Sequence, residues 1–282
     1  MTATLDTLAT RRAAAYDGIY AGATVKPVTI ESFERWARFV LDVPPGESGH
    51  PNGNEIALAL RRFGVDQLQG KRVLDYCCGV GRTSVYFALR GASVSAFDAS
   101  PKAIEVARRT AEASGVADRV RYGVMPAQAL EYEDNAFDAA YCQSALHILV
   151  DYPDFELAAR ELARVLKPGA RAVFSEEPLG HNPLLAPVRL WRRRRYSDCG
   201  GRTLRYADIR AFGRPFARAT MHHFNLLSQV KSIMRARSVR GAQRVLLRGM
   251  QRCDAWLLDN VPALRPLAGK VVIEFEKAEA PG

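Results

Sequence analysis

The sequence predicts an α/β protein with a Rossmann-like, doubly wound sheet, mostly parallel with one late antiparallel strand, plus an N-terminal helical cap and an inserted lid. Two observations predict this fold. Between residues 70 and 178, short β-branched runs alternate with helical segments, which is typical of a parallel sheet. A glycine-containing turn follows the first of these runs, at the place where open α/β sheets bind ligands. The length of 282 residues and the 48% hydrophobic composition allow a sizeable core.

The strands and helices of this core follow from local signals. Ser100 offers a helix N-cap, Pro101 occupies the first helical position, and Gly115 stops the same helix. Asp151 is the expected N-cap of a later helix that has Pro153 near its start. We therefore expect strands at 72–77, 93–97, 119–124, 136–141 and 170–175, and helices at 82–89, 101–114 and 151–166.

The segments on either side of the core have a different pattern. The N-terminal residues show helical periodicity without strand alternation, and we interpret them as a helical cap. After the core come a Pro/Arg-rich insertion, a late strand and a basic helical stretch, which we interpret as a lid. The expected organisation is a cap at 1–69 with helices at 11–20, 31–41 and 55–63, the core at 70–178, a late strand at 216–227 within a lid at 179–269, and the last strand at 270–276 with a tail to residue 282.

The net charge of +10 is concentrated in one segment of the chain. Between residues 189 and 252 there are 17 Lys and Arg against two acids, Asp198 and Asp208. A localised positive field favours acidic ligands, anionic lipid surfaces or nucleic acid as partners, and a solvated helical surface is an equal alternative. Trp191 precedes the run Arg192–Arg195, a composition that suits a membrane interface or RNA.

Signals for targeting and for metal binding are missing from the sequence. No run in the sequence reaches the roughly 20 apolar residues that a membrane span needs. The first residues do not resemble a signal peptide. The five cysteines show no CxxC or zinc-ligand spacing. We expect a cytoplasmic protein without a metal site, in peripheral contact with the inner membrane surface where the basic segment meets anionic lipid.

A glycine loop and an acidic residue indicate a ribose-bearing cofactor. Gly79 and Gly81 let the backbone approach a ligand closely, and the helix that follows presents free N–H groups. Asp98 ends the second strand, 19 residues after Gly79, where its carboxylate can accept both hydroxyls of a ribose. Ser84 stands where a dinucleotide fingerprint requires its third glycine, and no Walker loop occurs.

Four segments together resemble the class I S-adenosylmethionine-dependent methyltransferases. Residues 73–81 are similar to motif I of that family, although its usual Gly-Cys-Gly is Cys-Cys-Gly here. Residues 94–100, 135–141 and 164–169 are similar to the motifs at strands two, four and five, in the same order and spacing. The resemblance covers about residues 70–178 well and the remainder loosely, and it implies S-adenosyl-L-methionine as the cofactor.

The resemblance also implies which residues hold this cofactor. Asp75 and the backbone of Gly79 to Gly81 correspond to the site of the methionine end, and Asp98 to that of the ribose. The adenine loop of the family reads Gly-Asp-Ala-Glu, whereas this chain has Met125-Pro126-Ala127-Gln128 and lacks the acid. The expected cofactor-binding residues are Asp75, Cys77, Gly79, Gly81, Asp98, Ala99, Ala127, Gln128 and Gln143.

Histidines near two strand ends are candidates for catalysis. Methyl transfer to a hydroxyl requires an aligned nucleophile and a group that removes its proton. His147 matches the first of a His-His pair that relatives carry, and Ile148 replaces the second. Residues 176–184 resemble a Glu-Pro-x-Gly-His-Asn-Pro signature of a bacterial small-molecule subgroup, which places His181 on a lid. The candidates are His147, His181 and Glu177, followed by His222 and His223, and a structural role is the alternative for each histidine.

The acceptor is expected to be a small or lipid-like molecule that is fairly hydrophobic or acidic and is methylated on oxygen, with nitrogen and carbon left open. Nucleic acid is disfavoured as the acceptor, because Cys142 lacks the neighbouring Pro of cytosine-5 methylases and the Asn/Asp-Pro-Pro-aromatic motif of exocyclic-amine methylases is absent. Three alternatives remain. They are an RNA- or protein-directed methyltransferase that docks through the basic lid, a nicotinamide-dependent oxidoreductase, and a relative that binds the cofactor without turnover.

Overall fold

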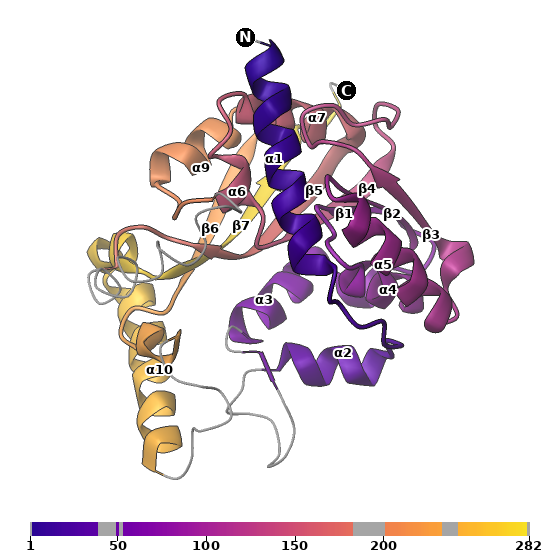
Figure 1. Cartoon of the computed structure of the whole chain (residues 1–282). Helices are drawn as coiled ribbons and strands as arrows, with labels where there is room; N and C mark the ends of the chain where they lie inside the picture. The colour runs from indigo at the N-terminus through magenta and orange to yellow at the C-terminus, as the bar shows by residue number, and fades with distance from the viewer. Residues whose placement is uncertain (1, 39–48, 51–52, 183–200, 233–241, 281–282) are drawn as a thin grey trace.

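A seven-stranded sheet forms the centre of the computed structural model, which describes residues 2–38, 49–50, 53–182, 201–232 and 242–280 (Figure 1). The strand order is β3-β2-β1-β4-β5-β7-β6. Strands β1 to β5 pair in parallel, and β7 runs antiparallel to both β5 and β6, as predicted. The strands are β1 (Arg72–Tyr76), β2 (Ser93–Asp98), β3 (Val120–Val124), β4 (Phe137–Gln143), β5 (Leu166–Pro178), β6 (Arg218–Phe224) and β7 (Lys270–Glu276).

Helices fill the connections between the strands. The Ser100 hydroxyl accepts a hydrogen bond from the Ala103 N–H at 3.0 Å, with Pro101 at the first helical position, so this predicted helix start is confirmed. The helices are α1 (Thr2–Tyr20), α2 (Ile30–Ala37), α3 (Gly53–Phe63), α4 (Arg82–Leu89), α5 (Pro101–Ala113), α6 (Leu146–Leu149), α7 (Phe155–Val165), α9 (Tyr206–Phe212) and α10 (Ala242–Asn260), and the 3-10 helices are η1 (Val65–Gln67), η2 (Ala117–Arg119), η4 (Ser228–Ser232) and η6 (Pro262–Leu267).

The prediction that Asp151 caps the third core helix is wrong. Helix α7 begins at Phe155, after Asp154, because the short helix α6 and the turns behind it occupy residues 146–154. Asp151 instead pairs with Arg12 at 2.6 Å and accepts the Gly201 N–H at 3.2 Å. Both partners are far away in the sequence, so no local signal could reveal them.

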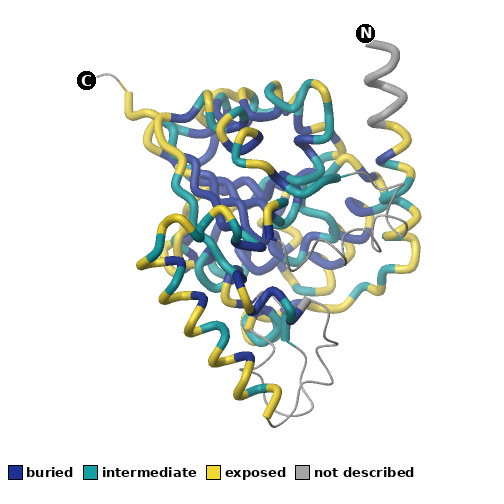
Figure 2. The backbone as a smooth tube through the Cα atoms, turned by 90° about the vertical axis from the view of Figure 1, so that its left-hand side faces the viewer, coloured by how far each residue is buried: buried dark blue, intermediate teal, exposed yellow. Residues whose placement is uncertain are grey.

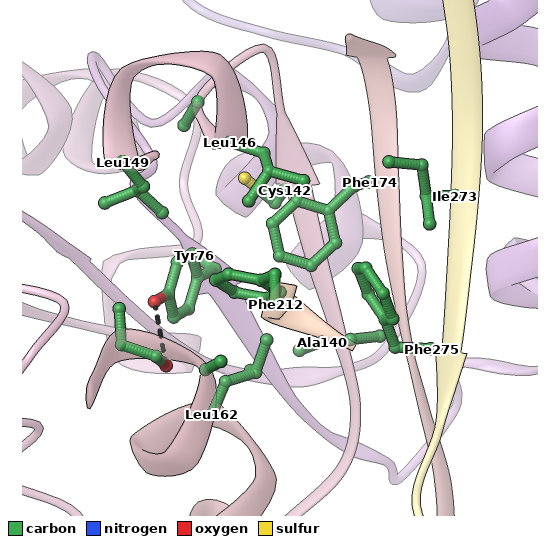
Figure 3. Close-up of a cluster of buried hydrophobic side chains, with 14 of the residues drawn as sticks. Tyr76, Ala140, Cys142, Leu146, Leu149, Leu162, Phe174, Phe212, Ile273 and Phe275 are labelled. Atoms are coloured by element: carbon green, nitrogen blue, oxygen red, sulfur yellow. Dashed lines mark hydrogen bonds between the residues drawn. The ribbon is translucent and has the colours of Figure 1, made fainter. Parts of the chain in front are cut away.

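Neighbouring residues of the strands point to opposite faces of the sheet and build two hydrophobic clusters. Leu74, Cys142 and Phe174 face the cluster that contains α7 and α9, whereas Val73 and Val173 face the cluster that contains α3 and α4. Figure 3 shows part of the first cluster, in which the rings of Phe174, Phe212 and Phe275 lie 5.4 to 5.5 Å apart. Burial of each large side chain contributes about 1.5 to 3 kcal/mol.

The N-terminal segment completes the core and also lies beside the carboxyl ends of the strands. Helix α3 packs on β5 and β7, and α2 packs on α3 and α4. Helix α1 lies along α5 and, in Figure 1, runs in front of the sheet near the ends of its strands. The described part of the chain has no helix long and apolar enough to cross a bilayer. The run Arg192–Arg195, for which the sequence predicts contact with a membrane interface or RNA, lies outside the described residues.

Candidate functional site

A cavity of about 270 Å³ lies between α1 and the carboxyl ends of β1 to β4. This volume is near the lower end of the roughly 300 to 1,000 Å³ typical of ligand pockets. Four sets of residues line it, one from each strand end, together with residues of α1 and α6. The predicted site residues in the lining are Cys77, Asp98, Ala99, Ala127, Gln128, Gln143 and His147.

Asp98 connects the glycine loop to the end of β2. One carboxylate oxygen accepts the Gly79 N–H at 2.9 Å, and the other accepts the Ser100 N–H at 3.0 Å. Burial raises the pKa of Asp98, and these hydrogen bonds oppose the rise. The carboxylate thus holds two loops in place and also lines the cavity.

Gly79 and Gly81 shape the loop rather than line the cavity. Their φ angles are +51° and +74°, a region that other residues adopt at a cost. A Cβ on Gly81 would lie 2.6 Å from the Tyr122 hydroxyl and 2.8 Å from the Ala107 Cβ. Both the conformation and the space at Gly81 therefore require glycine.

Gly81→Ala is expected to destabilise the fold by about 2 to 5 kcal/mol, the sum of a left-handed backbone cost and overpacking. Gly115→Ala is a matched control, because Gly115 has a φ of +71° with nothing within 4 Å of a Cβ. The control should lose only about 1 to 2 kcal/mol. Urea unfolding measures the free energy of unfolding of both variants. Equal losses would show that the close packing around Gly81 does not contribute to the cost of the substitution.

Asp75 lies in β1, just before the glycine loop, and is not among the residues that line the cavity. It is almost fully buried and accepts a hydrogen bond from the Ser84 hydroxyl at 2.5 Å. Ser84 is the residue that departs from the dinucleotide fingerprint, and it joins the end of β1 to the first turn of α4. The hydrogen bond of Asp75 thus joins β1 to α4, the two elements that flank the glycine loop.

Asp75 is expected to make stability depend on pH. Burial raises its pKa from 3.8 to about 7. The folded state holds this proton more tightly than the unfolded chain, so the associated stability is complete below about pH 4 and is lost as pH rises through about 7. In urea titrations of the ligand-free protein, the free energy of unfolding of wild type relative to Asp75→Asn should fall between about pH 4 and about pH 7 and level off above that. A difference that is constant over this range contradicts the raised pKa.

Glu177 positions His147 instead of lining the cavity. The Glu177 carboxylate is fully buried and accepts the N–H groups of Ala145 and Leu146 at 2.9 Å and of His147 at 3.1 Å. These bonds hold the first turn of α6. The same carboxylate lies 3.1 Å from Nδ1 of His147. Since a carboxylate only accepts hydrogen bonds, this contact places a hydrogen on Nδ1 and leaves the Nε2 lone pair to accept a proton.

The other predicted histidines lie elsewhere. His181 is exposed and stacks on Tyr206 with ring centroids 5.7 Å apart. His222 contacts Glu274 at 2.6 Å, and Nε2 of His223 lies 2.9 Å from the Tyr206 hydroxyl. Burial lowers the pKa of His223 to about 4, so its ring is neutral at pH 7. His222 and His223 line a second cavity of about 370 Å³ between β6 and α10, and none of the three lines the first cavity.

Helix α1 contributes to the cavity, which was not predicted from the sequence. Arg12, Tyr16 and Tyr20 of α1 line the cavity. The Arg12 guanidinium lies 4.2 Å from the ring centre of Tyr152, another lining residue. Their spacing of four residues places the three side chains on one helix face. This spacing was a usable signal, but nothing in the sequence indicates what that face covers.

Glu176 is a second residue that the sequence analysis missed. It follows the paired part of β4 and β5 with a φ of +61°, a strained conformation of the kind that clusters at functional sites. Its carboxylate accepts a hydrogen bond from Nε2 of Gln143 at 2.5 Å and lies 3.3 Å from Nδ1 of His50. Glu176 thereby fixes the Gln143 side chain at the wall of the cavity.

Sequence comparisons agree with the predicted core. Residues 73–169 match the family model of a methyltransferase domain. The methyltransferase GfsG of Streptomyces halstedii is 35% identical over 113 residues, which cover 40% of this chain and 40% of that protein. The ubiquinone biosynthesis O-methyltransferase of Methylocella silvestris is 34% identical over 164 residues, which cover 54% of this chain and 62% of that protein. The chain thus spans about half the length of these relatives.

A solved structure supports the fold. Phosphoethanolamine N-methyltransferase 2 of Haemonchus contortus, in complex with S-adenosyl-L-methionine, is similar with a TM-score of 0.54 at 19% identity, over 89% of this chain and 58% of that chain. At this identity the likeness shows the fold alone, and it confirms the predicted Rossmann-like sheet. The family match lies within residues 70–178 and supports the interpretation of that segment as a methyltransferase domain.

Proposed function

We propose that this chain is an S-adenosyl-L-methionine-dependent methyltransferase whose cofactor occupies the cavity between α1 and the ends of β1 to β4. The observation that carries the proposal is the position of Asp98. Its carboxylate ends β2, lines the cavity and anchors the glycine loop of β1. A carboxylate at this place can accept the two hydroxyls of a ribose, and the sequence match covers the same strands.

The other lining residues fit the remaining parts of this cofactor. Met125, Ala127 and Leu149 offer apolar surface for an adenine ring, and the Gln128 amide lies beside them. Cys77 and Gln143 line the end nearest β1 and β4, where the methionine part would lie. When bound, S-adenosyl-L-methionine supplies a methyl group on a positively charged sulfur. Tyr16 and Tyr20 of α1 line the same cavity and would lie against the bound cofactor.

His147 is the proposed general base for a hydroxyl acceptor. Glu177 orients its ring through Nδ1, so Nε2 would take the proton of an acceptor hydroxyl. Bound S-adenosyl-L-methionine would supply the methyl group to the acceptor oxygen, with its methyl–sulfur bond broken and S-adenosylhomocysteine left behind. Transfer requires the oxygen, carbon and sulfur to be in line, which is a matter of positioning. Cys142 takes no part, because it is fully buried in the core cluster.

The proposed acceptor is a small, fairly hydrophobic or acidic molecule that is methylated on oxygen. One relative is named as an O-methyltransferase of ubiquinone biosynthesis, which supports an aromatic hydroxyl as the acceptor class. The apolar part of the cavity lining also suits such a molecule. Formation of S-adenosylhomocysteine with a panel of phenols and hydroxyquinones tests this proposal, and acceptance of RNA alone would favour the RNA-directed alternative.

A further inference from the structure

Helix α10 carries an exposed apolar stripe. Val245, Leu246 and Trp256 are 74%, 65% and 62% exposed, the highest values among the large hydrophobic side chains of the described residues. At 3.6 residues per turn these three side chains fall within an arc of about 100°. Gly249 and the exposed Cys253 lie in the same arc. We name these five residues the α10 stripe.

The stripe is not a core face turned outward by a rotation of the helix. On the opposite side of α10, Leu247 and Leu258 are buried. Asp254 lies between them and accepts the N–H groups of Leu226, Leu227 and Ser228 and the Ser228 hydroxyl, at 2.6 to 3.0 Å. These bonds fix the rotation of α10 about its axis. Figures 1 and 2 show the helix projecting from the rest of the fold.

A row of arginines borders the α10 stripe. Arg244, Arg248 and Arg252 follow one another at intervals of four residues, and Arg248 and Arg252 are exposed. On the helical wheel Arg252 lies about 20° from Val245. An apolar face flanked by cations is the pattern of helices that lie in the interface of an anionic bilayer, because the negative surface potential attracts the cations.

We infer that the α10 stripe docks on the surface of a membrane that contains anionic lipid. A second copy of this chain is a poorer occupant for two reasons. The three large apolar side chains offer on the order of 300 to 400 Å², less than the roughly 800 Å² per partner of a standard interface. The arginine rows of two copies, each with a net charge of +10, would also repel one another. This inference is independent of the proposed catalytic activity.

Vesicle flotation with the full chain tests the inference. Wild type should bind vesicles of phosphatidylcholine with phosphatidylglycerol at least tenfold more tightly than vesicles of phosphatidylcholine alone, and salt should weaken the binding. The triple variant Val245→Ser, Leu246→Ser, Trp256→Ser should lose at least tenfold in affinity. Leu157→Ser on α7 is its control, since Leu157 is also an exposed apolar side chain.

Two further double variants distinguish an effect of the arginine row on vesicle binding from an effect of the net charge of the protein. Arg248→Gln with Arg252→Gln should weaken binding severalfold, whereas Arg119→Gln with Arg210→Gln removes the same charge from other exposed positions and should leave it nearly unchanged. Circular dichroism checks the fold of each variant. Brominated lipid should quench a Trp256 signal, obtained as the difference between wild type and Trp256→Phe.

The inference is overturned by any of four results. The triple variant binds anionic vesicles as tightly as wild type, or Trp256 is not quenched while the protein floats. Alternatively, wild type is a dimer in solution and the triple variant is a monomer, which assigns the stripe to a second copy. Loss of binding only on replacement of Arg192–Arg195 by Ser would move the membrane contact to that run.

Discussion

Alanine in place of His147 is expected to lower turnover by about 10²- to 10⁴-fold, the range that a positioned general base contributes. The geometry gives the reason. Glu177 holds Nδ1 at 3.1 Å, and His147 is one of the residues that line the cavity in which the methyl group is proposed to lie. Affinity for S-adenosyl-L-methionine should change less than tenfold, because no cofactor group is assigned to His147. Initial rates of S-adenosylhomocysteine formation with saturating acceptor measure the effect.

His181→Ala provides the matched comparison for His147→Ala. His181 is exposed, stacks on Tyr206 and does not line the cavity, so turnover should stay near that of wild type. If both variants keep near-full turnover, His147 is not the base and catalysis relies on proximity. A selective loss in His181→Ala would restore the lid role that the signature at residues 176–184 implies.

Asp98→Ala should weaken S-adenosyl-L-methionine binding at least tenfold. Each hydrogen bond to a charged acceptor contributes about 1.5 to 3 kcal/mol, and two ribose hydroxyls are assigned to this carboxylate. The variant also frees the Gly79 N–H, which Asp98 holds at 2.9 Å. Calorimetric titration measures the affinity.

The control for Asp98→Ala is Asp118→Ala, which removes an exposed carboxylate in η2. Its affinity should equal that of wild type. Circular dichroism and urea unfolding establish that both variants are folded. An Asp98→Ala protein that is folded and binds the cofactor as tightly as wild type would refute the assignment of the ribose site.

Elements with local signals were predictable from the sequence. Helix α4 has the predicted bounds, and α5 begins at the predicted cap, because Ser100 and Pro101 act within one helical turn. The prediction failed at Asp151, where an ion pair with Arg12, 139 residues away in the sequence, takes the place of the local capping contact. Capping signals are read from near neighbours, whereas this contact depends on the tertiary fold.

The site was predictable where backbone topology determines it. Strand ends of a parallel sheet meet at one edge, so Cys77, Asp98 and Gln143 were expected near one another, and they line one cavity. Side-chain roles that depend on long-range contacts were not predictable. Glu177 and Glu176 are adjacent acids in sequence, yet one caps α6 and orients His147 while the other fixes Gln143.

Calorimetric titration of the wild-type protein with S-adenosyl-L-methionine and with NADH determines which cofactor occupies the cavity at Asp98. We expect binding of one S-adenosyl-L-methionine per chain, competition by S-adenosylhomocysteine, and no competition by NADH. Tight binding of NADH without binding of S-adenosyl-L-methionine would refute the proposed function, because the cavity at Asp98 would then belong to a nicotinamide-dependent oxidoreductase.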